Sequence, residues 1–339
     1  MNQESGAEKL DSSLLGLFDF RQDWAEMQPF FARVSRLPAD TEAFTLRYGT
    51  FLDDRGVQDF VGALRQVNEI AGSLGGPATL KQRIGEDPNY LFAAEPPGEI
   101  YAHLVWLASQ IANGASTFSG TLPRVRDLQS TAVPPQERAR SVRRILVGDG
   151  GLVSTATGMR SKIQRLRERL VPLVPRLTAV IQTFNQTKLV NQANETIGAL
   201  QGEIKRLQKQ ADEADEAAKG WFGKDKAKKE SETFSKKIET DSAELRRKTV
   251  FAEDLRDFSI TANRVVPALM NTDDRLRKTE KVFADAAERL TSVCTLASDE
   301  QLSNYDWLAG AADFPTALSK WNGVEGAAHE FVQGSMVSL

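Results

Sequence analysis

Few side chains in this sequence are of the types that bind metals or act as catalytic nucleophiles. The chain has two histidines, His103 and His329, and one cysteine, Cys294. Glu330 follows His329, but the second histidine that a zinc-binding helix requires is missing. Cys294 lies in an apolar helical pattern, which favours a buried thiol over a reactive thiolate. We therefore expect structural histidines, no metal, no cofactor and no enzyme activity.

The segment VGDGGLVST (147–155) resembles a phosphate-binding loop in its glycines alone. It lacks the lysine of that motif, and no hydrophobic strand precedes it. The sequence also has no G-x-S-x-G nucleophile elbow. We interpret the glycines as a turn between two helices.

Residues 219–229, KGWFGKDKAKK, have a composition that suits a membrane surface. A Trp-Phe pair stands between two glycines and among lysines. Aromatic rings favour the headgroup region of a bilayer, and each nearby lysine gains about 1 kcal/mol at an anionic surface. We predict a membrane-contacting tip of nine residues: Lys219, Gly220, Trp221, Phe222, Gly223, Lys224, Lys226, Lys228 and Lys229. The alternative is a solvated turn in which the aromatic pair covers a layer of alanines, and the sequence leaves both open.

Two long helical patterns flank the tip. Before it, apolar residues recur at the heptad spacing of a coiled coil: Val190, Ala193, Ile197, Leu200, Ile204, Leu207, Ala211, Ala214 and Ala218. After it, a second series has residues seven apart: Leu255, Ala262, Leu269, Leu276, Phe283, Leu290 and Ala297. Between Pro175 and Pro267 there is no proline, so the glycines of the tip are the expected break. The patterns predict an antiparallel hairpin with arms near 176–218 and 228–266.

Prolines should limit these arms. Pro172 and Pro175 are expected to kink or break the helix before the first arm, and Pro267 should bend the second arm where it continues.

The remaining sequence also has helical patterning, and no strand-like alternation of any length appears. Helices are predicted near 20–37, 40–73, 98–119 and 135–147, with Asp40 as an N-cap. We predict an all-α fold in three parts. Residues 1–150 form a helical tail bundle, 151–297 form the long coiled-coil hairpin with its tip at 219–229, and 298–339 form a C-terminal helical segment that packs back on the bundle.

Charge and hydropathy narrow the class of partner. The formal net charge is −3, which gives no field to recruit nucleic acid. No window reaches the roughly 20 apolar residues of a membrane-spanning helix. The first residues, MNQESGAEKLDSS, have neither a basic region nor an apolar core, so we expect no standard signal peptide.

With this layout the chain resembles the α-helical pore-forming toxins, and among them the B-type subunit of the xenorhabdolysin-like two-component toxins. The resemblance rests on length, on the hydrophilic hairpin and on the stretch AAKGWFGKDKAKKE (217–230). It implies a secreted cytolysin subunit that oligomerises on a target-cell lipid membrane and perforates it, working with a second toxin subunit in a homo- or hetero-oligomeric ring. The chain departs from many such toxins because it has no apolar tongue.

Two other functions fit the same patterns. A cytoplasmic coiled-coil scaffold or adaptor would use the heptads to recruit a partner helix and would have no membrane activity. A nucleic-acid-associated coiled coil would use the lysines, but an acidic run at 212–216 precedes them and argues against it. Dye release from liposomes separates the toxin from both.

Overall fold

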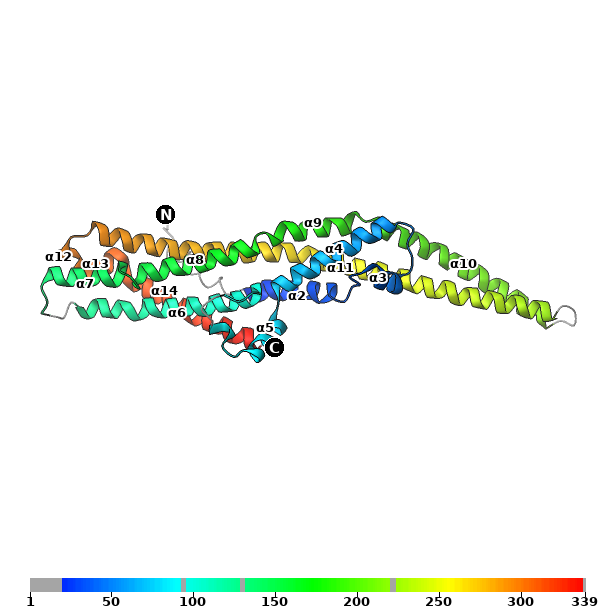
Figure 1. Cartoon of the computed structure of the whole chain (residues 1–339), viewed down its shortest axis with the longest axis horizontal. Coiled ribbons are helices and arrows are strands. Elements are labelled where there is room, and N and C mark those ends of the chain that lie inside the picture. Colours follow the sequence, from blue (N-terminus) through cyan, green and yellow to red (C-terminus); the bar gives the residue numbers. More distant parts are fainter. Residues whose placement is uncertain (1–19, 93–95, 129–131, 220–223, 338–339) are drawn as a thin grey trace, which may run out of the picture. The chain divides into compact units, whose positions relative to one another are not determined.

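The computed structural model describes residues 20–92, 96–128, 132–219 and 224–337, and the regular structure in these ranges is entirely helical. The all-α class predicted from the sequence is therefore confirmed. The elements are α2 (Phe20–Val34), α3 (Thr41–Tyr48), α4 (Asp54–Leu74), α5 (Pro77–Glu86), the 3-10 helix η2 (Tyr90–Phe92), α6 (Ile100–Asp127), α7 (Pro135–Val147), α8 (Leu152–Leu170), α9 (Leu173–Gln186), α10 (Leu189–Ala218), α11 (Lys224–Leu296), α12 (Asp299–Leu302), α13 (Tyr305–Ala312) and α14 (Phe314–Val337) (Figure 1).

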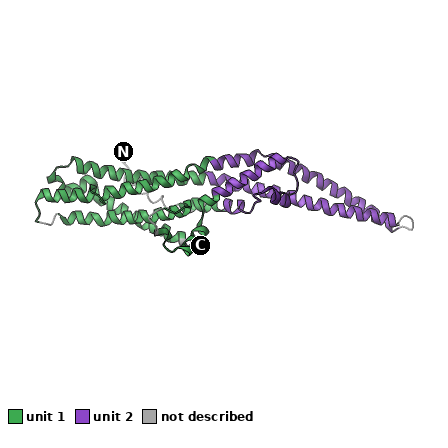
Figure 2. Cartoon of the chain, in the orientation of Figure 1, with its two compact units in different colours: residues 1–28, 71–175, 267–339 green, residues 29–70, 176–266 purple. Residues whose placement is uncertain are grey.

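The chain divides into two compact units (Figure 2). Unit 1 takes the described residues within 1–28, 71–175 and 267–339, and unit 2 takes 29–70 and 176–266. This division differs from the boundaries expected from the sequence, because residues 29–70 belong with the hairpin. Three of the four points where the chain passes between the units lie beside a proline: Pro29, Pro175 and Pro267. Pro29 and Pro267 lie inside α2 and α11, where a proline removes one helical hydrogen bond, while Pro175 lies in the first turn of α9, which tolerates a proline.

The helix predicted at 40–73 is two helices. Asp40 caps the first as predicted, because its carboxylate accepts a hydrogen bond of 2.7 Å from the Ala43 N–H. Gly49 then ends α3 with φ 76°, a conformation that residues with a Cβ rarely adopt. The predicted continuous helix from 40 to 73 was therefore wrong at the glycine.

The first hairpin arm is also interrupted. The structure places a break at 187–188, between α9 and α10, where the Thr187 hydroxyl accepts a hydrogen bond of 3.3 Å from the Leu189 N–H. Such local side-chain bonds compete with the helical pattern. The expected break at Pro172 is confirmed, since α8 ends at Leu170 and α9 begins at Leu173. The second arm is one helix of 73 residues, α11, which contains Pro267.

Unit 1 is built around α6, most of whose residues are buried. The Phe118 ring stacks on Trp321 of α14 with centroids 4.5 Å apart, and Phe283 of α11 packs against the same indole. Burial of α6 explains its apolar composition near residues 101–115. None of the described helices combines the length and the apolar character needed to cross a membrane.

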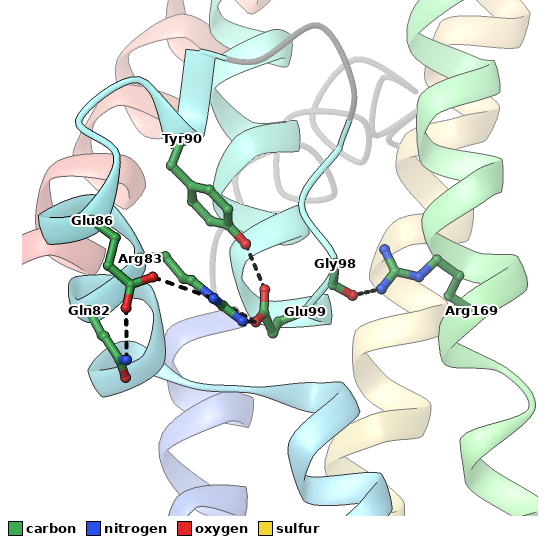
Figure 3. Close-up of polar contacts among 7 residues, drawn as sticks. All are labelled: Gln82, Arg83, Glu86, Tyr90, Gly98, Glu99 and Arg169. Carbon is green, nitrogen blue, oxygen red and sulfur yellow. Dashed lines mark hydrogen bonds and ion pairs between the residues drawn. The ribbon is translucent and has the colours of Figure 1, made fainter.

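A hydrogen-bonded cluster around Glu99 fastens the segment before α6 (Figure 3). The Glu99 carboxylate accepts a bond of 2.6 Å from the Tyr90 hydroxyl and one of 3.0 Å from the Arg83 guanidinium. The carbonyl of the preceding residue, Gly98, accepts a bond from Arg169 of α8. Burial acts to raise the pKa of Glu99, but the bonds from Tyr90 and Arg83 outweigh it, and the pKa is lowered. Burial and Glu99 together raise the pKa of Tyr90 to about 12, so the phenol stays protonated as a donor.

The lowered pKa of Glu99 predicts a pH-dependent contribution to stability. Because the folded pKa lies below the unfolded one, the contribution is complete above the unfolded pKa and is lost as the pH falls through the folded pKa. We expect Glu99→Gln to lower the free energy of unfolding by about 1 to 2 kcal/mol at neutral pH. Urea unfolding at neutral and at acidic pH measures this, with the more exposed Glu86→Gln as control. A deficit that persists unchanged in acid would contradict the assignment.

Candidate functional site: the hairpin and its base

The tip predicted from the sequence falls partly outside the described residues. Four of its nine members lie outside them: Gly220, Trp221, Phe222 and Gly223. Lys219 is the exposed C-cap residue of α10, and Lys224 is the first residue of α11. Three further lysines are exposed on the first turns of α11: Lys226, Lys228 and Lys229. The described part of the tip is therefore a solvent-facing basic surface, while the position of the aromatic pair stays a prediction.

The seam between α10 and α11 follows the predicted heptads. On α10 three of the nine positions are fully buried, Ala193, Leu207 and Ala214, and the other six are half-buried. The seven positions predicted after the tip, from Leu255 to Ala297, are buried as well, but the last five of them belong to unit 1 and not to the seam with α10. Ala227 is buried between the exposed lysines of the first turns, which extends the contact of small residues toward the tip. The hairpin arms thus meet along a thin seam in which most α10 residues keep part of their surface in water.

One charged contact links the two arms. The Glu203 carboxylate of α10 lies 2.7 Å from the Lys237 ammonium of α11 and 2.6 Å from the Arg206 guanidinium. Hydrogen bonds from Arg206 and then from Lys237 lower the pKa of Glu203 to about 2. The contact is exposed, so it fixes the register of the arms more than it stabilises them.

The base of the hairpin is an aromatic cluster around Phe251 of α11, which is 1% exposed. Four rings surround it at centroid distances of 4.9 to 5.8 Å: Phe44, Tyr48, Phe51 and Phe60. These rings come from α3, α4 and the connection between them. Aromatic pairs of this geometry add about 0.5 to 1.5 kcal/mol each beyond their buried area. The cluster explains why residues 29–70 belong to the same unit as the arms.

A buried lysine lies beside this cluster. Lys248 is 2% exposed, and its ammonium donates to the Tyr48 carbonyl at 3.0 Å and to the Thr50 carbonyl. The same ammonium lies 3.1 Å from the Glu244 carboxylate and 3.6 Å from the centroid of the Phe51 ring. Burial lowers the pKa of Lys248, and Glu244 opposes the shift. We call Lys248, Glu244 and the two carbonyls the clamp.

Two neighbours of the clamp support it. A Cβ at Gly49 would lie 2.5 Å from a Glu244 carboxylate oxygen, so a side chain there would displace the clamp. The Tyr48 hydroxyl donates to the Asp254 carboxylate at 2.8 Å, and Arg47 pairs with the same carboxylate at 2.6 Å. The α3–α4 connection is thus fastened to α11 by polar bonds on both sides of the rings.

Sequence reasoning missed the clamp, although one signal could have found it. Lys248 lies seven residues before Leu255, so it continues the heptad series of α11 toward the tip. A lysine at a core heptad position indicates a buried acceptor.

Two of the residues considered for metal binding or catalysis, His103 and Cys294, are buried in the helical core. His103 is fully buried, and its Nδ1 lies 2.9 Å from the Arg169 guanidinium. Burial, followed by Arg169 and Arg165, lowers the pKa of His103 to about 4, and a site beside a guanidinium is unsuited to a metal cation. Burial also raises the pKa of the Cys294 thiol to about 11.

His329 is exposed on α14. Among the described residues, no group of three or more His, Cys, Asp and Glu side chains could hold a metal ion. The segment 147–155 is the turn between α7 and α8, with Gly150 at φ 71°, as the sequence predicted.

Comparisons with known proteins give the fold a context. No protein-family model matches the sequence, and a search of the curated proteins finds no match. Among solved structures, the AhlB pore of the tripartite α-pore-forming toxin from Aeromonas hydrophila matches 94% of this chain and 96% of its own, with 12% identity and a TM-score of 0.51. Soluble SmhA of the tripartite toxin from Serratia marcescens matches 99% and 96% of the two chains, with 15% identity and a TM-score of 0.48.

The match to AhlB shows that this chain has the fold of an α-pore-forming toxin component over nearly its whole length. The resemblance in fold predicted from the sequence is confirmed. The assignment to a B-type subunit stays a prediction.

Proposed function

We propose that the chain is a subunit of an α-pore-forming toxin that oligomerises on a target membrane and perforates it. The observation that carries the proposal is the likeness in fold to the AhlB pore, which extends over 94% of the chain. Proteins of one fold can have different functions, so the chain's own residues must also support a toxin function. They do so at the hairpin, where two antiparallel arms end in exposed lysines on either side of a Trp-Phe pair.

The proposed membrane contact uses the tip. Trp221 and Phe222 enter the headgroup region, and Lys226, Lys228 and Lys229 bind anionic headgroups. Helices keep their backbone groups hydrogen-bonded in lipid, so the arms need no strand or coil to enter it. The half-buried seam of α10 then supplies surface for neighbouring subunits, and the polar faces of the arms line a water-filled lumen.

The proposal includes a companion subunit. No described helix is apolar enough to cross a membrane, so a hydrophilic hairpin needs neighbours that cover its polar faces. AhlB and SmhA both belong to toxins of several components. We propose that this chain works with at least one further helical protein in a homo- or hetero-oligomeric ring, and that it is secreted and soluble before it meets the membrane.

Release of a trapped dye from liposomes tests the proposal. The purified chain is added alone and together with the product of the neighbouring reading frame, and each protein alone serves as control. We expect release with the pair and little or none with either single protein. Absence of both release and liposome binding under all three conditions would favour the scaffold function instead.

The lysines of the tip should give binding that depends on lipid charge. We expect the quadruple variant of Lys224, Lys226, Lys228 and Lys229 to glutamine to lose affinity for phosphatidylserine vesicles, and little for phosphatidylcholine vesicles. Each lysine contributes about 1 kcal/mol, and the loss should shrink as salt is raised because charges are screened beyond about 8 Å at physiological ionic strength. Vesicle co-flotation at two salt concentrations measures it.

A matched control has the same net charge as the quadruple tip variant. It replaces four other exposed lysines: Lys188, Lys205, Lys236 and Lys281. An equal loss in both variants would show that net charge acts, and not the tip.

A further inference from the structure

A pocket in unit 1 lies far along the sequence from the tip and has no part in the proposed membrane contact. Its volume is about 440 Å³, within the range of about 300 to 1,000 Å³ that small-molecule sites occupy. Its walls come from α6, α8, α11, α13 and α14. Buried apolar side chains line it, among them Phe118, Leu122, Leu152, Leu290 and Phe314. Trp321, which stacks on Phe118, completes the apolar wall.

The pocket also has charged side chains on opposite walls. Asp285 and Arg289 belong to α11, while Lys320 belongs to α14 and Asp313 precedes that helix. Arg289 and Asp313 lie 3.9 Å apart and pair with each other. Among the described residues, no ion pair within 4 Å involves Asp285 or Lys320. The lining thus carries equal numbers of positive and negative side chains. A ligand with only a positive or only a negative charge would therefore meet a side chain of like charge, Lys320 or Asp285.

The corner between α13 and α14 shapes one edge of the pocket. Asp313 caps α13 in the left-handed conformation with φ 54°, and its carbonyl accepts a bond of 2.9 Å from the Ala317 N–H. Asp is among the few residues with a side chain that adopt this conformation readily. Small side chains follow at Thr316 and Ala317, which leave the space open.

From these features we propose that the pocket binds a single-chain amphiphile with a zwitterionic phosphocholine headgroup. The alkyl chain lies along the Phe118, Leu290 and Trp321 wall. The phosphate faces Lys320, and the quaternary ammonium faces Asp285. This proposal does not rest on the proposed function, because none of the pocket residues belongs to the hairpin tip.

Calorimetric titration of the full chain with dodecylphosphocholine below its micellar concentration tests the site. We expect saturable binding that Ala317→Phe weakens by at least about tenfold, since a phenyl ring would fill the space used by the chain. Far-UV circular dichroism and the melting temperature check that this variant folds. If Ala317→Phe does not fold, the test uses Ala286→Phe instead, which fills the pocket from the α11 side.

The headgroup is tested with matched ligands and variants. Lys320→Gln and Asp285→Asn should each weaken dodecylphosphocholine by about threefold, as expected for partly exposed charges. Neither should change the weaker binding of dodecyl maltoside, which has the same chain and a neutral headgroup. Lys281→Gln, an exposed lysine on α11, is the control and should change nothing.

Two results would overturn the proposal. One is unchanged affinity in the folded cavity-filling variant, and the other is equal affinity for the neutral and the zwitterionic headgroup. A Trp221→Ser/Phe222→Ser variant separates this site from the tip, because the pocket predicts unchanged binding of the amphiphile. Loss of binding in that variant would place the ligand at the tip and contradict the pocket.

Discussion

Replacing Trp221 and Phe222 together with serine is expected to weaken binding of the chain to lipid vesicles by a few kcal/mol and to leave its folding nearly intact. Transfer of each large apolar side chain from water contributes about 1.5 to 3 kcal/mol. Substitutions of exposed residues usually change stability by less than about 0.5 kcal/mol. Vesicle flotation and thermal melts on the same double variant measure the two quantities.

The chain offers a matched control for this variant. Leu46 and Leu52 in unit 2 are 78% and 98% exposed, so Leu46→Ser/Leu52→Ser also removes two exposed apolar side chains. We expect that control to keep its lipid affinity. If the Trp-Phe variant melts at a lower temperature with unchanged lipid affinity, the pair covers the alanine layer, and the solvated-turn interpretation holds.

The second large effect is expected at the clamp. Lys248→Met keeps most of the side-chain volume but removes the donor to the Tyr48 and Thr50 carbonyls and the partner of Glu244. Burial lowers the pKa of Lys248, so the buried charge itself costs free energy, and the loss on substitution comes from the acceptors left behind. We expect the free energy of unfolding of unit 2 to fall by about 3 kcal/mol.

Hydrogen exchange followed by mass spectrometry localises this effect. Protection should fall in residues 41–60 and 244–258, while peptides of unit 1 keep theirs. Lys236→Met, an exposed lysine on the same helix, should cause almost no change. Adding Glu244→Gln to Lys248→Met should restore part of the loss, because it removes a carboxylate that has lost Lys248 and keeps only the longer contact of 3.7 Å with Arg247. Equal protection in the Lys248→Met and Lys236→Met variants would show that the clamp does not hold the base.

The heptads made the hairpin predictable, because burial in a coiled coil follows spacing alone. All seven positions from Leu255 to Ala297, six of them on α11, are buried, as their spacing predicted. The break at Thr187 could not be predicted in the same way, because it depends on one local hydrogen bond with no periodic signal. Gly49 carried a readable signal, but the regular apolar stripe across it suggested one helix.

The base of the hairpin was not predictable from local pattern. The rings of Phe44, Phe60 and Phe251 come from distant segments, and their meeting sets which residues belong to each unit. A lysine is almost always exposed, so Lys248 looked like a surface residue until its acceptors were located. The pocket beside Trp321 had no sequence signal either, since Phe118, Phe283 and Trp321 fit an ordinary core.

The central claim is that the tip of the hairpin contacts lipid. An environment-sensitive NBD fluorophore on a single cysteine at Asp225→Cys, in a Cys294→Ser background, reports on this most directly, since Asp225 is exposed in the first turn of α11. The reference label is at Lys281→Cys, an exposed position of the same helix in unit 1. On addition of anionic vesicles we predict brighter, blue-shifted emission at 225 and unchanged emission at 281. Unchanged emission at 225, with vesicles in excess, would contradict the claim.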